Sequence, residues 1–460
     1  MARTPASKRN LLHAPTKAAI KKGVGRKIVN KLMDNRTRVS DASTKNATVS
    51  SPFARGSLFP IFFTVFLDMV GIGIIIPVLA VLFLGPSSAL FAPTVAMTTR
   101  TLLLGALIAT YPLGQFFGAP LFGALSDRHG RKPVLIYTLI GTAIGYILFA
   151  IGILTQQLWL LFVSRAIDGL TGGNIAVAMS AIADVSTKES KAKNFAVVGM
   201  AFGLGIVIGP FIGGLLADPS NFSWFNAATP IWFAAFLALL NIALVYWLFT
   251  ETLQKPRTTS VSLKAGFSNL RAALARPHLR LIFSVFFLMM IGFAFFTQFF
   301  SAYLVGRFSL SEGQIGNTFA YLGMWIIIVQ GLITRSVSKR YEPASVLRVS
   351  LLGLAIAIPF LLIPNQWMGI FFVLPFTALF QGLTMPNMTA LVSNAAHADE
   401  QGEILGIQQS VQAIAITLPP LLSGFLFSLH MSLPIALGGL FVAFAWILFV
   451  AKYRTVPISN

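Results

Sequence analysis

Three charged side chains lie inside apolar stretches of the sequence, where charge is costly. Asp68 stands well inside one apolar run, and Arg165 and Asp168 lie three residues apart in another. Placing one such charge at the centre of a bilayer costs about 2.5–3.5 kcal/mol on insertion scales, so these side chains are expected to face protein or water. A carboxylate whose proton affinity depends on its surroundings can take up and release a proton. The three residues therefore suggest proton chemistry.

Arg165 and Asp168 permit two interpretations. Residues three apart share one face of a helix, so the pair can simply neutralise itself and hold the fold together. Alternatively, Asp68 and Asp168 share the one embedded arginine, and protonating one of the two acids then has a low electrostatic cost. Asp68 has no charged neighbour in the sequence and is the first candidate for the proton-binding group, with Arg165 and Asp168 tuning it.

A charged turn, GALSDRHGRK from Gly123 to Lys132, separates two long runs without charge, 101–126 and 133–164. Such a cluster cannot lie in hydrocarbon, and an excess of Lys and Arg is typical of cytoplasmic loops. The turn is therefore expected to be a short cytoplasmic loop between two spanning helices.

The composition indicates an all-α integral membrane protein. The 460 residues are 56% hydrophobic and only 10% charged, and a spanning helix needs about 20 mainly apolar residues. The absence of cysteine excludes disulfides and thiolate catalysis. The five histidines are scattered, and no nucleophile–base pair appears, so we expect no metal site, no cofactor and no enzyme activity.

Twelve apolar spans are expected, in two pseudo-symmetric bundles of six. An even number puts both termini on one side, and the loops on that side hold almost all the basic residues; Arg100 and Arg307 are the exceptions. Both termini are therefore expected in the cytoplasm, in the plasma membrane or, alternatively, an organellar membrane. The spans are 59–84, 101–125, 133–154, 158–183, 194–217, 230–250, 279–304, 316–334, 345–363, 367–393, 403–428 and 434–451.

Four parts follow from these spans. Residues 1–57 form a basic tail, 58–250 the first bundle, 251–278 a cytoplasmic linker with an amphipathic helix, and 279–454 the second bundle. The tail is expected to be disordered; the alternatives are an amphipathic helix on anionic inner-leaflet lipid and a targeting peptide. The net charge of +20 is concentrated in the tail and the loops, so no nucleic-acid partner is expected.

The fifth span contains a glycine-rich segment that ends in GPFIGG. Small residues let helices approach closely, and a proline bends the helix. Glycine pairs alone indicate only packing, whereas their combination with proline is more specific. The residues concerned are Gly205, Gly209, Pro210, Gly213 and Gly214.

The second half of the chain offers neutral polar groups and aromatic rings instead of embedded charges. An amide among phenylalanines can donate and accept hydrogen bonds in a greasy cargo cavity. Gln298 fits this description, although it could equally make a contact between helices. The candidate cavity residues are Gln298, Phe295, Phe296, Gln381 and Asn387.

These motifs resemble those of the major facilitator superfamily, in particular the twelve-helix drug/proton antiporters and most of all the tetracycline/proton antiporter branch. The turn at Gly123 is similar to that family's loop between helices two and three. DMVGIGIIIP from Asp68, SRAIDGLTGG from Ser164 and the GPFIGG segment are similar to its motifs in helices one, four and five. The resemblance covers about residues 58–450.

The resemblance implies a gate made of charged residues. Asp127 and Arg131 of the loop would join Asp184 at the inner end of the fourth span, and Asp68 would lie near cargo and proton. The remaining loop-motif positions are Gly123, Arg128 and Gly130. The chain departs from the family by carrying Asp168 and by lacking an acid in the seventh or ninth span, which argues against tetracycline itself as cargo.

The sequence thus predicts a monomeric transporter that exports amphiphilic, drug-like small molecules in exchange for protons by alternating access. Two alternatives stay open. One is a metabolite facilitator or proton symporter of the same superfamily. The other is a non-transporting receptor or sensor that uses residues 1–57 to bind a partner.

Overall fold

The computed structural model describes residues 52–85, 90–187, 191–253, 268, 271, 275, 277–337, 339–395 and 401–453. Within these ranges the chain is helical and contains no strand. The predicted tail and the amphipathic helix of the linker lie almost wholly outside the described residues. The first helix, α2, already begins at Pro52.

Twelve of the described helical stretches are long and apolar enough to cross a membrane, from 58–84 to 433–452. The predicted fold class is therefore confirmed, and the ends of the spans differ from the predicted ones by a few residues. The first half consists of α2 (Pro52–Leu84), α3 (Met97–His129), α4 (Arg131–Leu154), α5 (Leu158–Thr171), α6 (Asn174–Val185), α7 (Lys191–Ala217) and α8 (Thr229–Leu248). The second half consists of α10 (Pro277–Phe308), α11 (Glu312–Ile328), the π-helical η3 (Val329–Thr334), α12 (Arg335–Val337), α13 (Pro343–Phe360), α14 (Trp367–Asn394), α15 (Gln401–Leu429) and α16 (Leu433–Lys452).

The fourth span is broken, which the sequence analysis did not foresee. α5 ends at Thr171, α6 begins at Asn174, and Gly172 and Gly173 lie between them. A Cβ atom on Gly173 would stand 2.7 Å from the carbonyl oxygen of Gly118 in α3. The break therefore lies where α3 approaches too closely for any larger residue.

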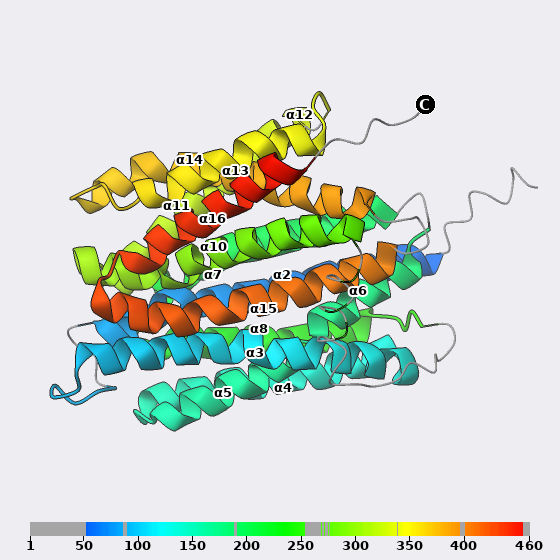
Figure 1. Cartoon of the computed structure of the whole chain (residues 1–460). Coiled ribbons are helices and arrows are strands. Elements are labelled where there is room, and N and C mark those ends of the chain that lie inside the picture. The colour runs from blue at the N-terminus through cyan, green and yellow to red at the C-terminus, as the bar shows by residue number, and fades with distance from the viewer. Residues whose placement is uncertain are drawn as a thin grey trace, which may run out of the picture. The chain divides into compact units, whose positions relative to one another are not determined.

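Within residues 56–460 the two halves meet along two pairs of helices, α3 with α15 and α7 with α11. In Figure 1, α10, α11, α13, α14 and α16 lie on one side and α3, α4, α5 and α8 on the other, with α2, α7 and α15 between them. Within residues 56–460, the first span (58–84) begins and α16 ends at the same end of the bundle (Figure 1). We call that end the terminal face and the opposite end the distal face.

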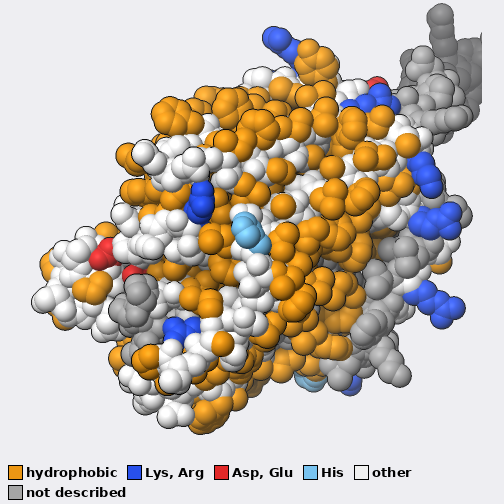
Figure 2. All heavy atoms as spheres, turned by 60° about the vertical axis from the view of Figure 1, so that its left-hand side comes forward, with side chains coloured by type: hydrophobic (Ala, Val, Ile, Leu, Met, Phe, Trp, Pro, Cys, Tyr) orange, Lys and Arg blue, Asp and Glu red, His pale blue; other side chains and the backbone are white. Residues whose placement is uncertain are grey.

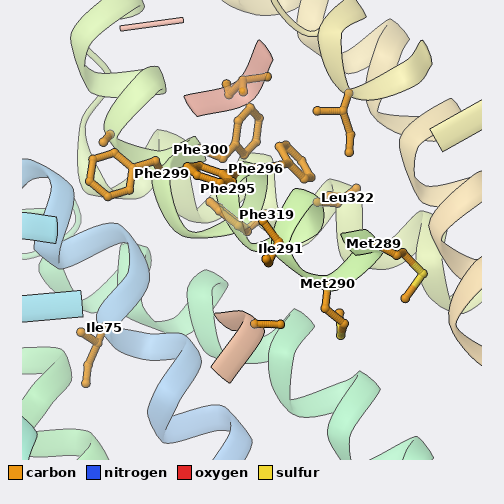
Figure 3. Packing of buried hydrophobic residues seen from close by; sticks show 14 of the residues in the cluster. Ile75, Met289, Met290, Ile291, Phe295, Phe296, Phe299, Phe300, Phe319 and Leu322 are labelled. Atoms are coloured by element: carbon orange, nitrogen blue, oxygen red, sulfur yellow. The ribbon is translucent and has the colours of Figure 1, made fainter. Parts of the chain in front are cut away.

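Phenylalanines of α10 fill the core of the second half. Phe295 stacks on Phe441 of α16 with ring centroids 5.7 Å apart, and Phe300 meets Phe319 of α11 at the same distance. Figure 3 shows Phe296, Phe300 and Phe319 close together between α10 and α11. Helices within a bilayer are held together by such packing because lipid is as apolar as the side chains.

The outer surface of the bundle is largely apolar. Figure 2 shows a broad hydrophobic surface, with most of the visible Lys and Arg side chains toward one edge. Trp247 and Phe372 are among the most exposed large side chains, at 76% and 78%. A surface of this kind is suited to lipid, and the chain is accordingly an integral, multi-pass membrane protein.

Candidate functional site

Asp68 lies in the middle of α2, buried at 6% exposure and bound to an amide. Its Oδ1 accepts a hydrogen bond of 2.8 Å from Nδ2 of Asn174, the first residue of α6, which is 1% exposed. Its Oδ2 is also buried and has no hydrogen-bond partner among the described residues. One carboxylate oxygen of Asp68 is therefore hydrogen-bonded to a neutral group, and the other has no hydrogen-bond partner among the described residues.

Arg165 forms an ion pair with Asp168 on the same face of α5. Nη2 of Arg165 lies 2.9 Å from Oδ2 of Asp168, but the two atoms do not have hydrogen-bond geometry, and both lack such a bond among the described residues. The guanidinium also lies over three rings, with centroids at 4.9 Å (Phe149), 5.8 Å (Tyr146) and 5.9 Å (Tyr111). Its charge is thus offset by one carboxylate and three aromatic faces.

The structure divides the two acids between different partners. Asp168 forms an ion pair with Arg165, whereas Asp68 accepts a hydrogen bond from Asn174. Asp68 and Arg165 are not ion-paired in this conformation. The arginine shared by both acids, one of the two sequence interpretations, is therefore not observed here. The sequence analysis missed Asn174; a polar residue directly after two glycines within an apolar span was the available signal.

A small pocket lies beside Asp68 between α2, α4 and α8. Its polar lining consists of Asp68, Thr142, Tyr146 and Asn241, and the rest is apolar. The hydroxyl of Tyr146 is buried without a hydrogen-bond partner among the described residues. Asn241 is engaged elsewhere, because its Oδ1 accepts a hydrogen bond of 3.0 Å from Thr64. Unpartnered polar atoms at a buried carboxylate are unusual and mark this region as a candidate site.

The predicted charged gate residues come together at the terminal face. Arg131 is 1% exposed, and its guanidinium lies 2.7 Å from Asp127 and 2.8 Å from Asp184. It also donates a hydrogen bond of 2.6 Å to Ser126. Arg128 is exposed, and Gly123 has open space beside it among the described residues. The network residues Ser126, Asp127, Arg131 and Asp184 all belong to the first half.

Glu251, three residues after the end of α8, is a further member of this region that was not predicted from the sequence. Its two carboxylate oxygens accept hydrogen bonds of 3.0 Å from the backbone N–H groups of Arg131 and Lys132. A carboxylate at a helix N-terminus satisfies free N–H groups and complements the helix dipole. Gly130, at φ 100°, turns the chain there, and a Cβ atom on it would stand 2.6 Å from Oε2 of Glu251.

The glycine-rich segment places α7 between α2 and α11. A Cβ atom on Gly209 would stand 2.7 Å from Cα of Gly73 in α2, and one on Gly214 would stand 2.9 Å from Cα of Gly316 in α11. Gly205 and Gly213 face the backbone of α2 in the same way, and the ring of Pro210 lies against Gly73. The segment thus joins α7 to its own half and to the other half.

Close contacts between the halves concentrate at the distal end. Gly105 of α3 meets Gly424 of α15 there, and Gly214 meets Gly316. Nearer the terminal face, a Cβ atom on Gly199 or Gly203 of α7 would have no described atom within 4 Å. The halves are therefore packed together at the distal face and less closely at the terminal face.

The candidate cargo residues of the second half are mostly engaged in packing. Phe295 and Phe296 are 1% and 0% exposed, within the core described above. Gln298 donates a hydrogen bond of 2.9 Å to the carbonyl oxygen of Ile416 in α15. This is the helix contact that was its alternative interpretation. Asn387 donates within its own helix, and Oε1 of Gln381 is buried without a hydrogen-bond partner in the described part of the chain.

Buried charged side chains are distributed unequally between the two halves. Among the described residues, the buried charged side chains are Asp68, Arg131, Arg165 and Asp168, all in the first half. Within the same ranges, no group of three or more His, Asp or Glu is placed to hold a metal ion.

Two bundles of spanning helices, with a buried acid in the first helix and a charged loop after the second, define a secondary-transporter fold. The family model of the Major Facilitator Superfamily matches residues 58–420 and, in a second match, residues 308–459. The chain belongs to the Major Facilitator Superfamily and is a membrane transporter by family and by fold.

Known relatives support this assignment. The tetracycline resistance protein, class C, of Escherichia coli is 31% identical over 372 residues, covering 80% of this chain and 89% of that protein. The quinolone resistance protein NorA of Staphylococcus aureus is 26% identical over 409 residues, covering 88% and 98%. The crystal structure of the human organic anion transporter MFSD10 shares the fold, with a TM-score of 0.66 at 23% identity, covering 87% of this chain and all of that one.

Proposed function

We propose that this protein exports amphiphilic, drug-like small molecules in exchange for protons, and that Asp68 is the group that binds the proton. The observation that carries the proposal is the state of Asp68: a carboxyl buried in the middle of a spanning helix, with a neutral partner on one oxygen and none among the described residues on the other. A buried carboxylate is costly when charged, so its occupancy by a proton responds to solvent access and to cargo.

The arginine pair has a different role in this proposal. Arg165 lies 2.9 Å from Asp168 and favours its ionised form, and breaking a buried ion pair leaves an uncompensated charge. Asp68 has no such partner and can change its protonation state alone. Arg165 and Asp168 together set the electrostatic field in which Asp68 operates.

Alternating access would proceed by rocking of the two halves about the proton site. The present conformation is closed by packing at the distal face. In the opposite conformation the terminal face would close, and the open space beside Gly123 would let a helix of the second half approach. Asp127, Arg131 and Asp184 would then fix the first half's side of that closed gate.

The terminal face is assigned to the cytoplasm. At that end, Arg128 lies in the last turn of α3, Arg131 and Lys132 begin α4, and Arg340 lies before α13. Basic residues in short loops favour the cytoplasmic side. With this orientation the observed conformation faces inward, ready to receive cargo from the cytoplasm, and the plasma membrane is the compartment in which export is useful.

The names of the relatives suggest the kind of cargo. They include tetracycline and quinolone resistance proteins, and both compound classes combine a planar ring system with polar substituents. The second half of this chain presents neutral amides and aromatic rings, and no buried acid among its described residues. A cargo that needs a carboxylate from the second half is therefore disfavoured, and a neutral or zwitterionic aromatic compound fits better.

The decisive experiment measures proton release from the purified full-length protein with a pH-sensitive dye. Tetracycline and norfloxacin serve as separate probes. Addition of a transported compound should release protons from the wild type but not from Asp68→Asn. Glu342→Gln, a change of an exposed acid before α13, is the matched control and should behave as the wild type does. Unchanged proton release in Asp68→Asn would contradict the assignment.

A second arm separates export from uptake. In vesicles with an imposed pH gradient, an antiporter moves the probe against the direction of proton flow, and a symporter moves it along with the protons. Transport along the proton gradient would favour the symporter alternative, and transport insensitive to it a facilitator.

A further inference from the structure

We propose that Asn174 is the positioning residue for proton binding: it holds Oδ1 of Asp68 and so leaves Oδ2 as the atom that takes the proton. The inference rests on the proposed role of Asp68. It explains why Asp68 and not the neighbouring Asp168 would bind the proton, and how the Asp68 side chain keeps its orientation when its charge changes.

The position of Asn174 depends on the break in the fourth span. The backbone N–H of Gly172 bonds to the carbonyl oxygens of Asp168 and Gly169, which ends α5, and α6 starts at Asn174. Both glycines lie against α3: a Cβ atom on Gly172 would stand 2.9 Å from the hydroxyl oxygen of Tyr111, and one on Gly173 would lie 2.7 Å from the Gly118 carbonyl oxygen. Close packing against α3 thus accounts for the break, and the break places the buried amide of Asn174 beside Asp68.

A neutral amide is suited to a carboxyl that changes its charge. When Asp68 is ionised, Oδ1 accepts the N–H of Asn174 at 2.8 Å. When a proton binds Oδ2, Oδ1 becomes the carbonyl oxygen of the acid and still accepts the same hydrogen bond. The side chain therefore keeps its orientation in both states, and the proton always arrives at the same atom.

The neighbouring acid shows the opposite arrangement. Asp168 faces the fixed charge of Arg165, which favours the ionised carboxylate. Two buried acids of the same half thus have partners of different kinds, one charged and one neutral. This difference explains why Asp68 and not Asp168 would exchange protons.

Asn174 and Asp68 each have one further polar atom that could form another hydrogen bond, which fits this role. Oδ1 of Asn174 and Oδ2 of Asp68 are both buried and lack hydrogen-bond partners among the described residues. The titratable and charged groups nearest to Asp68 on the surrounding elements are Tyr111 of α3, Tyr146 of α4, and Arg165 and Asp168 of α5.

The test is an infrared titration of the Asp68 carboxyl in the purified full-length protein, without cargo. The carboxyl band is assigned as the band absent from Asp68→Asn. In Asn174→Leu, which keeps the approximate shape but removes the donor, the midpoint of the band should move to higher pH by about one unit or more, because the lost hydrogen bond is stronger to the charged carboxylate than to the neutral acid. Asn174→Ser, with a shorter side chain, is the second variant if the leucine protein does not fold.

Asn194→Leu is the matched control, because Asn194 is also a buried asparagine of the first half, bonds to Ser186 instead of Asp68 and does not line the pocket. Its band should titrate as in the wild type. An unchanged midpoint in the Asn174 variants, or an equal shift in Asn194→Leu, would overturn the inference.

The outcomes distinguish this inference from the proposed function. If the wild-type band titrates and cargo releases protons, but the Asn174 variants have the wild-type midpoint, then only the role of Asn174 fails. If no Asp68 band titrates in the wild type, then Asp68 is not the proton-binding group, and both proposals fall.

Discussion

Asp218, directly after α7 in the first half, accepts a hydrogen bond of 3.2 Å from the hydroxyl of Ser311 in the second half. Ser311 is the N-cap of α11 and forms a capping box with Gln314. The carboxylate also lies so close to Gly313 that a side chain there would collide with it. An acid of one half thus sits at the N-terminus of a helix of the other half, where an anion is stabilised by free N–H groups and by the helix dipole.

Removing the charge of Asp218 should loosen the distal contact between the halves. In Asp218→Asn we expect the population that is open at the distal face to rise by roughly fivefold, about what one net hydrogen bond contributes. Spin labels on the loop after α7 and the loop before α11 measure the change as a longer distance. Ser220→Ala removes a hydrogen bond to the same carboxylate from within the first half and should leave the distance distribution much closer to that of the wild type. Equal distributions in wild type and Asp218→Asn would contradict the prediction.

The same contact should depend on pH in a defined direction. Partial burial favours a higher pKa for Asp218, but hydrogen bonds from Ser220, Ser311 and the backbone of Gly313 outweigh it and hold the pKa below its usual range. The contact is therefore complete above the ordinary aspartate pKa of about 4 and is lost only as the pH falls through the lowered value. Glu312, the nearest other acid, adds negative charge beside it.

We accordingly expect the distal label distance to stay constant between about pH 7 and pH 5 and to lengthen only below about pH 4. Asp218→Asn should lack the low-pH transition. A transition of the wild type near neutral pH would show that a different group controls this contact.

Gly214 should tolerate no side chain, because α11 lies directly against it. Gly214→Leu would place side-chain atoms where Gly316 now stands 2.9 Å from the position of a Cβ. Overpacking of this kind costs about 1–3 kcal/mol, so a lower thermal unfolding midpoint and a longer distal distance are expected. Gly199→Leu makes the same change in the same helix, where no described atom lies within 4 Å, and should have little effect on either measurement. Similar losses in both variants would show that the close contact with α11 is not the cause.

Arg131 should be essential for the order of the loop at the terminal face. Arg131→Ala leaves Asp127 and Asp184 facing each other without the cation that now lies 2.7 and 2.8 Å from them. Removing one member of a buried ionic network costs about 3–5 kcal/mol. We expect a large drop in the unfolding midpoint and, if folded protein is recovered, a smaller fraction closed at the terminal face. Arg128→Ala, a change of an exposed neighbour, is the control and should leave both properties unchanged.

Hydropathy predicted the helices well, because it reflects the bilayer and acts on stretches of about 20 residues. The break at Gly172 and Gly173 lies within a predicted spanning segment and has a tertiary cause, the approach of α3. Hydropathy cannot register it. The ion pair of Arg165 with Asp168 could be anticipated from their spacing alone, since both lie on one helix.

The partners of Asp68 and Arg131 were harder to foresee. Asn174 and Glu251 lie 106 and 120 residues away along the chain from the residues they bind. Contacts of this kind depend on how helices pack, which local patterns do not specify. Gln298 illustrates the same limit, since its environment in the sequence was compatible with a cavity as well as with the contact to Ile416 that the structure contains.

The confinement of buried charge to the first half has a consequence for how such a carrier can diversify. Substitutions in α10 to α16 can reshape the surface offered to a cargo without disturbing any buried ionic group among the described residues. Selection for new compounds can then act on one half while the energy-coupling groups of the other stay untouched. A chimera that joins residues 58–250 of this chain to the second half of a relative would be expected to inherit proton coupling from the former and compound preference largely from the latter.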